Sequence, residues 1–339
     1  MRTISVIVPC RNEIRHIRDF LESLLAQELD ADLQCEFLIA DGMSNDGTRN
    51  VLCEWQGRFA GLVVFDNKDQ TVSSGLNAAI CRAHGEIVIR MDVHAQYAPD
   101  YIGRCVAALD QTQADNVGGP ALTRGFTYIQ RAICLAYHSR FGCGGAHFHD
   151  PTYEGYVDTV TYGCWRKSTL ESLSLFDEAF VRNQDDELNL RLLRRGGTIW
   201  QTPKIRSWYQ PRSSLMALAR QYFQYGYWKT QLLRKHRIPA SLRHLVPGIF
   251  VAALMILGAT APFLTLSAYL FATAVAVYGL ASITASLIAC RTADTLLLLP
   301  VMPLVFAAYH LSYGVGFLSG LWHPAAGCRP PRMFTALSR

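Results

Sequence analysis

The chain has 339 residues and a formal net charge of +5, and half of its residues are hydrophobic. This length allows one large domain with its own core plus an appendage. Residues 1–244 hold 28 of the 32 basic and 26 of the 27 acidic residues, a balance of +2 that argues against nucleic-acid binding. The ten cysteines form no C-x-x-C pair, so we expect reduced, mostly buried thiols in the cytosol. The N-terminus enters a strand pattern directly, and we expect no cleaved signal peptide.

The first part of the chain alternates regularly between strand and helix patterns. Short apolar runs bounded by turn residues indicate strands, and apolar residues three and four apart indicate helices. Asn12 is predicted to cap the first helix, and Pro99 to open the fourth. The alternation predicts an open, doubly wound α/β sheet with crossover helices. We expect strands at residues 3–8, 36–40, 62–65 and 86–91, with helices beginning near Thr48 and Ser73.

Beyond residue 116 the alternation breaks down. Residues 141–150 are rich in glycine and histidine, which is typical of a mobile loop. Residues 157–162 are expected to form a further strand, and the acidic segment 183–188 to open a helix that ends at Gly196. Residues 215–229 are predicted to be a helix crowded with tyrosines, as at a membrane interface, although an aromatic-rich core helix has the same pattern.

The C-terminal part has the composition of a membrane anchor. Between residues 245 and 328 the only charged residues are Arg291 and Asp294. The runs 245–263, 265–290 and 295–321 each suffice for the roughly 20 apolar residues that cross a bilayer. Three such runs in succession favour membrane spans over buried core helices.

The distribution of basic residues predicts the orientation. Residues 229–244 carry five basic residues and no acid, which places them in the cytoplasm by the positive-inside rule. Three crossings would put the tail and its three arginines outside, against that rule. Either the rule is weakly violated or one segment is re-entrant or interfacial, and Pro300 and Pro303 make the last segment the candidate.

Polar clusters follow three of the expected strands. Open α/β sheets bind ligands at the carboxyl ends of their strands, so we expect the clusters to converge on one crevice. Any one of them is also compatible with a simple turn or helix cap, as Ser44 and Asp46 would be. The clusters are residues 9–13, 41–48 and 92–94.

Asp92 and His94 are predicted to hold a divalent metal ion. Asp92 follows the apolar run 87–91 and is therefore presented at the rim of a buried strand. A carboxylate with a second ligand two residues later can bind Mg²⁺ or Mn²⁺ and leave positions open for diphosphate oxygens. Histidine as the second ligand would favour Mn²⁺, whereas the alternative is a neutral His94 that only hydrogen-bonds near the site.

The acidic segment 183–188 supplies candidates for a general base. Acids in a first helical turn commonly interact only with the helix dipole, which is the alternative for two of its three acids. A carboxylate held at the rim of a crevice suits removal of a proton from an acceptor hydroxyl.

Together these motifs resemble the family 2 glycosyltransferases of GT-A fold, over roughly residues 1–230. Their order and spacing match, and the Asp-Val-His-Ala and Gln-Asp-Asp-Glu-Leu-Asn forms are most similar to exopolysaccharide glucosyltransferases of the succinoglycan-biosynthesis type. The segment 221–228 only partly resembles the Gln-x-x-Arg-Trp element of processive synthases, because its arginine position is not matched. The motifs are Ile-Val-Pro-Cys-Arg-Asn-Glu at 7–13, the turn at 41–48, Asp-Val-His-Ala at 92–95, and the acidic segments at 176–178 and 184–191.

The resemblance implies a role for each matching residue. Asp92 would carry the metal and the diphosphate, with His94 where many relatives have a second aspartate. Asp185 matches the catalytic base, although Asp186 is close enough that the choice stays open. The implied donor-binding residues are Pro9, Glu13, Asp41, Lys68 and Asp92.

We therefore expect an inverting, metal-dependent transfer of one sugar from a nucleotide-sugar, and the expected donor is UDP-glucose. The acceptor would be a polyprenyl-diphosphate-linked saccharide at the inner (plasma) membrane, and the catalytic domain of this multi-pass protein would be cytoplasmic. The alternatives are a processive polysaccharide synthase and a non-catalytic membrane partner with a transferase-like fold. The expected divisions are 1–212 for the GT-A domain, 213–244 for an interfacial and basic segment, 245–321 for about three transmembrane helices, and 322–339 for the tail.

Overall fold

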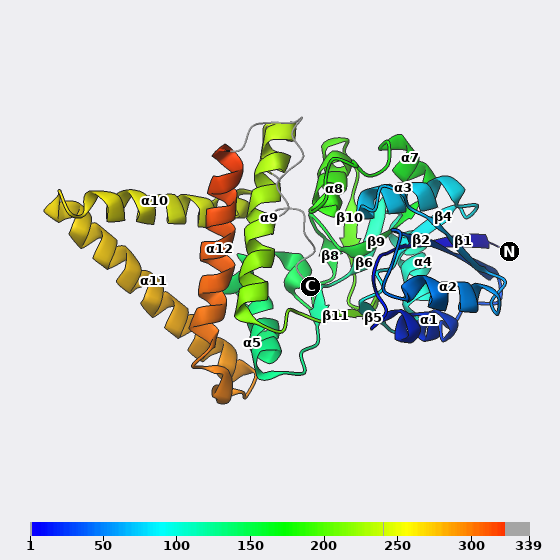
Figure 1. The fold of residues 1–339 in the computed structure, drawn as a ribbon, viewed down its shortest axis with the longest axis horizontal. Helices are drawn as coiled ribbons and strands as arrows, with labels where there is room; N and C mark the ends of the chain where they lie inside the picture. The colour runs from blue at the N-terminus through cyan, green and yellow to red at the C-terminus, as the bar shows by residue number, and fades with distance from the viewer. Residues whose placement is uncertain (1, 240, 323–339) are drawn as a thin grey trace. The chain divides into compact units, whose positions relative to one another are not determined.

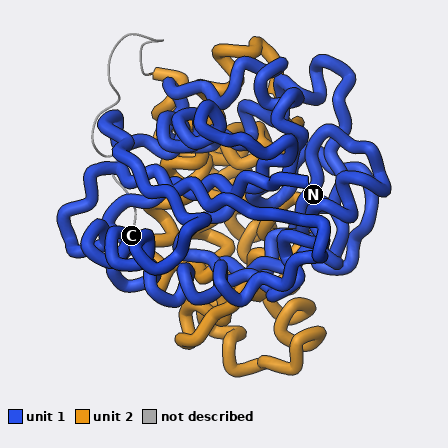
Figure 2. The backbone as a smooth tube through the Cα atoms, turned by 90° about the vertical axis from the view of Figure 1, so that its right-hand side faces the viewer, with its two compact units in different colours: residues 1–122, 147–209 blue, residues 123–146, 210–339 orange. Residues whose placement is uncertain are grey.

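The structure is a computed structural model that describes residues 2–239 and 241–322. The chain folds into two compact units (Figure 2). The sheet unit comprises Met1–Leu122 and His147–Tyr209, and the helical unit comprises Thr123–Ala146 and Gln210–Arg339. Apart from Trp322, the expected tail at 322–339 lies outside the described residues.

The sheet unit is built on a mixed eight-stranded sheet in the order β3-β2-β1-β4-β9-β6-β10-β8. The first four strands of that order run parallel to one another, β9 is antiparallel to both of its neighbours, and β8 is antiparallel to β10. The alternation read from the sequence is confirmed. The strands are β1 (Arg2–Cys10), β2 (Leu33–Asp41), β3 (Leu62–Asp66), β4 (Ile87–Arg90), β6 (Asn116–Gly119), β8 (Gly155–Tyr156), β9 (Thr161–Arg166) and β10 (Ile199–Gln201). A small second sheet contains β5 (Ala95–Tyr97), β11 (Ser207–Tyr209) and β7 (Leu122–Thr123).

Helices cover both faces of the large sheet (Figure 1). Successive side chains of a strand point to opposite faces, so Val6 packs into one core and Ile7 into the other. Strands buried on both faces read as continuous apolar runs, which is why β1, β2 and β4 stand out in the sequence. The first face carries α1 (Ile17–Leu25), α2 (Thr48–Gln56) and α4 (Tyr101–Thr112), and the second carries α3 (Val72–Arg82), α7 (Lys167–Ser172) and α8 (Gln184–Arg194).

Several local expectations were wrong. Asn12 does not cap the first helix, because α1 begins at Ile17 and Asn12 has a φ of 54° within a turn. The strand expected at 157–162 is mostly irregular, because residues 157–160 form the connection between β8 and β9, and β9 begins only at Thr161. Val157 and Val160 are buried in the core without being part of a strand. The stretch 141–150 is not a plain loop, since it holds part of α6 (Arg140–Cys143) and a short 3-10 helix, His147–His149.

Within the described residues, the helical unit contains three helices that are long and apolar enough to cross a membrane. The segments are Leu242–Thr260, Thr265–Thr292 and Met302–Trp322, which agree with the expected apolar runs. The helix expected at 215–229 continues to His236. The main elements are α5 (Tyr128–Tyr137), α9 (Leu215–His236), α10 (Val246–Thr260), α11 (Thr265–Thr292), a 3-10 turn at Leu296–Leu298 and α12 (Met302–Trp322).

Candidate active site

The candidate site lies at the carboxyl ends of the parallel strands, as expected for an open sheet. Strand β1 pairs with β2 on one side and with β4 on the other, so Asp41 and the residues after Arg90 lie at the same edge. Pro9 is half-buried near the end of β1, opposite Ala40 in the register. The sheet topology therefore brings the three predicted polar clusters to one edge.

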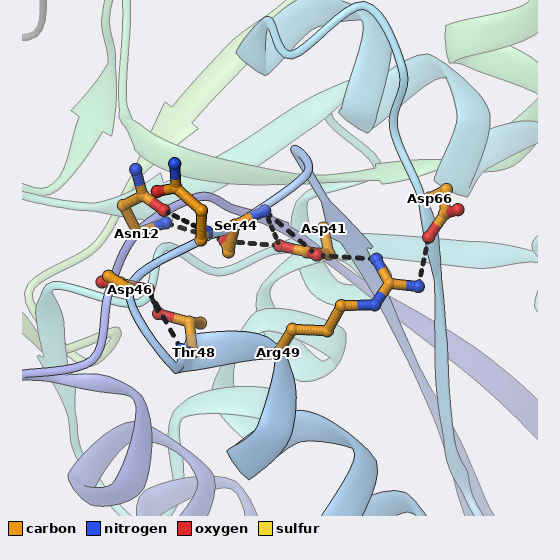
Figure 3. Close-up of polar contacts among 8 residues, drawn as sticks. Asn12, Asp41, Ser44, Asp46, Thr48, Arg49 and Asp66 are labelled. Atoms are coloured by element: carbon orange, nitrogen blue, oxygen red, sulfur yellow. Dashed lines mark hydrogen bonds and ion pairs between the residues drawn. The ribbon is translucent and has the colours of Figure 1, made fainter.

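The turns after β1 and β2 are held together by hydrogen bonds (Figure 3). The Asn12 amide donates to Ser44 Oγ at 2.8 Å, and Asn12 Oδ1 accepts from the Asn45 amide at 3.0 Å. The Thr48 hydroxyl donates to Asp46 Oδ1 at 2.6 Å and accepts from the Glu13 amide at 2.8 Å. Ser44 and Asp46 thus act as turn residues, and they fix the backbone that carries Glu13.

Asp41 is fully buried and forms an ion pair with Arg49. Its carboxylate accepts from Ser44 Oγ at 2.5 Å and from Arg49 Nη1 at 3.0 Å. Arg49 Nη2 lies 2.5 Å from Asp66 Oδ1 at the end of β3 (Figure 3). Arg49 and Asp66 have side chains about 41% and 40% exposed, so they, rather than Asp41, present polar groups at this edge.

A buried arginine joins two of the predicted acids. The Arg90 side chain is only 4% exposed, and its Nε and Nη2 bind the two Asp92 carboxylate oxygens at 2.8 and 3.0 Å. Its Nη1 binds Asp185 Oδ1. Burial alone would lower the pKa of Arg90, but the two carboxylates outweigh it and hold the pKa above its usual range. Arg90 therefore brings Asp92 and Asp185 together as a fixed, charged triad.

Asp185 lies in the first turn of α8 and differs from the acids beside it. Glu187 is fully buried and pairs with Arg191, which also donates to the Leu175 carbonyl at 2.7 Å, so this pair fastens the helix to the preceding turn. The Asp185 side chain is 40% exposed, but the protein around its carboxylate removes part of the hydration, and this desolvation raises its pKa to about 6. The negative charges of Asp92 and Asp186 add to the rise, and Arg90 opposes it. Because successive helical residues point about 100° apart, Asp186 is directed elsewhere than Asp185.

The backbone at Asp92 is held by a buried tyrosine. Tyr97 Oη accepts from the Asp92 amide at 2.6 Å and lies 3.2 Å from the Asp92 carbonyl. Burial raises the pKa of Tyr97 well above its usual value, so the phenol stays protonated. His94 is 45% exposed and its Nδ1 lies 3.8 Å from Glu13 Oε1.

The residues at this rim fit a metal ion that binds together with a diphosphate. The described part of the chain has no group of three or more His, Cys, Asp or Glu side chains that could hold an ion alone. Mg²⁺ and Mn²⁺ commonly use one or two carboxylates and take the remaining ligands from substrate phosphates and water. Asp92 keeps lone pairs beyond those that face Arg90, and the exposed His94 adds an imidazole. The Asp92–His94 metal pair remains a prediction.

The sequence motifs predicted Asp92 and Asp185, which the structure brings together on Arg90, but they did not point to three charged residues that hold the predicted ones. Arg49, Asp66 and Arg90 were not singled out. A charged residue inside the apolar run 87–91 is a signal that could have identified Arg90, because arginine is almost never fully buried unless it is paired. Lys68 lies exposed in the turn after β3, and nothing links it to the triad.

Comparisons with known proteins show which family the chain is similar to. The model of the family "Glycosyl transferase family 2" matches residues 5–132. The succinoglycan biosynthesis protein ExoA of Rhizobium meliloti is 32% identical over 244 residues, which are 71% of this chain and 73% of that protein. A dolichyl N-acetyl-alpha-D-glucosaminyl phosphate 3-beta-D-2,3-diacetamido-2,3-dideoxy-beta-D-glucuronosyltransferase of Methanococcus voltae is 29% identical over 243 residues, covering 69% of this chain and 75% of that protein. Among solved structures, a Pyrobaculum calidifontis mannosyltransferase in complex with GDP-Man and Mn²⁺ aligns with a TM-score of 0.59 at 20% identity, over 94% of this chain and 87% of that one.

Proposed function

This chain belongs to glycosyl transferase family 2, and we propose that it adds one sugar, glucose in the first instance, from a UDP-activated donor to a polyprenyl-diphosphate-linked saccharide. Its relatives support a transferase of exopolysaccharide or lipid-linked glycan biosynthesis: one is named for succinoglycan and another for a dolichyl-phosphate-linked sugar. The three apolar helices support membrane attachment, and the proposed location is the cytoplasmic side of the inner membrane.

The observation that carries the proposal is the Asp92–Arg90–Asp185 triad. In the proposed reaction the Asp185 carboxylate takes the proton of the acceptor hydroxyl. The acceptor oxygen then bonds to the anomeric carbon from the side opposite the leaving group. The bond from that carbon to the diphosphate oxygen breaks, and the nucleoside diphosphate leaves with the electron pair. A base with a pKa of about 6 is largely ionised at neutral pH and still basic enough to assist.

Asp92 and His94 are proposed to hold the divalent ion, Mg²⁺ or Mn²⁺. When bound, the ion would neutralise negative charge on the departing diphosphate. Arg90 holds the Asp92 carboxylate by two hydrogen bonds and Tyr97 holds its backbone, so the ligand is oriented before the donor arrives.

The donor nucleotide is proposed to lie over the ends of β1, β2 and β3. The ion pair with Asp41 fixes the position of the Arg49 guanidinium, and the partly exposed Arg49 and Asp66 present hydrogen-bonding groups for the nucleobase. The fully buried Asp41 would therefore contribute to nucleobase recognition by positioning Arg49. Pro9, Glu13 and Lys68 complete the proposed donor site.

The test is sugar transfer from labelled UDP-glucose into an extractable lipid product, measured with purified protein in detergent. Asp92→Asn and Asp185→Asn are each expected to abolish transfer while the protein stays in the membrane. Asp110→Asn is the matched control, because Asp110 forms an exposed ion pair with Arg2. Normal activity in both site variants would overturn the proposal.

Two further readouts resolve what the sequence left open. Asp186→Asn separates the two neighbouring acids: abolished transfer in this variant together with activity in Asp185→Asn would reassign the base. The length of the product separates single addition from polymerisation, since a processive synthase would release long polymer from the same donor.

A further inference from the structure

Helices α9 and α12 of the helical unit lie side by side along most of their length (Figure 1). The Tyr222 and Tyr309 rings stack at 4.2 Å, and Arg234 donates to the Leu321 carbonyl. Between these points, a Cβ added at Gly316 would collide with the Phe223 carbonyl oxygen. The residue numbers of the contacting positions increase together along both helices, so the two helices run parallel. The close approach at Gly316 shows that their backbones are in direct contact.

The other two apolar helices differ from α12 in their surroundings. In the most apolar stretch of α10 and of α11 only 11% is buried inside the protein, whereas 39% of the corresponding stretch of α12 is buried. Helices α10 and α11 project away from the α9–α12 pair and meet at their far ends (Figure 1). A helix with apolar residues exposed all round suits the bilayer interior, whereas a helix with one exposed stripe suits a surface.

Helix α12 has such a stripe. Three of its four exposed large apolar residues, Leu304, Val315 and Trp322, lie eleven and seven residues apart and therefore on nearly the same face; the fourth, Leu321, lies beside Trp322 in the last turn. The opposite side packs into the protein: Phe306 lies in the core of the helical unit, and Tyr309 Oη donates to the Ile133 carbonyl at 3.2 Å. Helix α12 is thus amphipathic in its packing although its composition is apolar.

The polar composition of α9 argues against a crossing by its partner. A parallel neighbour of similar length would have to enter the bilayer with α12, since both helices are about 32 Å long. Helix α9 carries the exposed Arg220 in its second turn and the half-buried Lys229 about two turns before its end at His236. Basic residues at such depths are rare in spanning helices.

The distribution of charge along the sequence agrees. The turn between α10 and α11, residues 261–264, has no charged residue, and its Phe263 is 84% exposed. Arg291 comes at the end of α11, and Arg329, Arg332 and Arg339 follow α12. Two crossings put all these arginines on the side of the basic segment 229–244, as the positive-inside rule favours, whereas three crossings put the tail arginines outside.

We propose that only the α10–α11 hairpin crosses the bilayer, while α12 lies in the headgroup layer of the same membrane beside α9. The lipid surface covers the Leu304–Val315–Trp322 stripe, and the C-terminus returns to the cytoplasmic side. This topology rests on the membrane attachment proposed above but not on the transfer reaction, so loss of activity would leave it intact.

The experiment locates two points of the full chain in bacterial cells. A fluorescent protein that matures only in the cytoplasm, or alkaline phosphatase that is active only outside, is fused after Arg339. A short epitope is inserted after Pro262 in the turn of the hairpin. We expect a fluorescent, phosphatase-negative C-terminus and an epitope that antibody reaches in intact spheroplasts. Phosphatase activity at the C-terminus, or an epitope reachable only after lysis, would overturn the proposal.

A matched pair of substitutions tests where α12 lies. Val315 and Val277 occupy the middle of α12 and α11 and are 44% and 61% exposed. Val315→Lys is expected to leave the carbonate-resistant, membrane-bound amount within about twofold of the unmodified chain, because lysine at the interface reaches water. Val277→Lys is expected to reduce that amount several-fold. Equal losses would refute a surface position for α12, and release of the unmodified chain by carbonate would refute the attachment itself.

Discussion

Replacing Arg90 by methionine tests whether the triad is needed for catalysis. The substitution keeps much of the side-chain volume but leaves Asp92 and Asp185 without their shared cation. Removing one partner of a buried ion pair costs about 3–5 kcal/mol, and we expect the lower end because the Asp185 side chain is 40% exposed and water can replace part of the contact. A domain of ordinary stability, about 5–15 kcal/mol, remains folded after such a loss.

The effect on the reaction is expected to exceed the effect on folding. A misplacement of about 1 Å in a catalytic group can cost about 100-fold in rate, so kcat should fall by at least that factor. Arg90→Lys keeps a charge but not the planar fork that binds two carboxylates. The kcat of this variant should therefore lie between those of the unmodified enzyme and Arg90→Met. Arg104→Met, which removes an exposed pair with Asp100, is the control and should behave as the unmodified enzyme.

The pH profile gives a readout that a purely structural role would not move. A general base works when deprotonated, so transfer by the unmodified enzyme should decline as the pH falls through about 6, the pKa of Asp185. Arg90 lowers that pKa, so removing it should move the acidic limb of the profile to higher pH. Initial rates between pH 5 and 9 on folded protein, verified by circular dichroism, measure both effects. An unshifted limb with an unchanged kcat in Arg90→Met would refute the reasoning.

Three other predictions follow from the same edge of the sheet and the helix beside it. Asp41→Asn and Arg49→Ala should each raise KM for the nucleotide-sugar about tenfold or more with a smaller change in kcat. An unchanged KM in both variants would exclude the proposed nucleobase-binding site. Chelation with EDTA should stop transfer and Mn²⁺ should restore it, with His94→Ala needing more Mn²⁺ for half-maximal rate; transfer that persists in EDTA would contradict the metal assignment. Glu187→Gln should lower stability by about 3 kcal/mol, seen as a lower melting temperature, while transfer well below that temperature persists, because the buried Glu187–Arg191 pair holds the helix and not the substrate.

The parallel half of the sheet could be predicted because its strands are buried on both faces. Strands β1, β2 and β4 each contain a buried apolar run, at residues 6–8, 37–40 and 87–89, and each strand is followed by a polar turn at the edge where the candidate site lies. Local signals failed where tertiary contacts decide the backbone. Asn12 resembles a helix cap, but its partners are Ser44 and Asn45, which lie beyond another strand.

The antiparallel half was harder to predict for a different reason. Strand β9 contains Tyr162 and Gly163 in succession, with φ values of 63° and 98°, and this break interrupts the alternation expected of a strand. A Cβ at Gly163 would collide with the Trp165 ring, so close packing selects glycine here. The signal at 157–162 came from two core valines, which are equally apolar in a strand or in an irregular segment.

The buried position of Arg90 links the donor and acceptor sides of the proposed site through charge. One guanidinium between two carboxylates leaves one net negative charge, so Asp92 can still attract a cation. The same guanidinium keeps the pKa of Asp185 low enough for its carboxylate to be ionised at neutral pH. Burial and the neighbouring acids raise the pKa of Asp185, and Arg90 limits that rise to about 6. A neutral residue at position 90 would strengthen the repulsion between the acids and favour a protonated base. Lysine would keep the charge but lacks the separate nitrogens with which Arg90 binds both Asp92 oxygens and also reaches Asp185. The geometry of one side chain therefore sets both where the donor ligand points and at what pH the base can act.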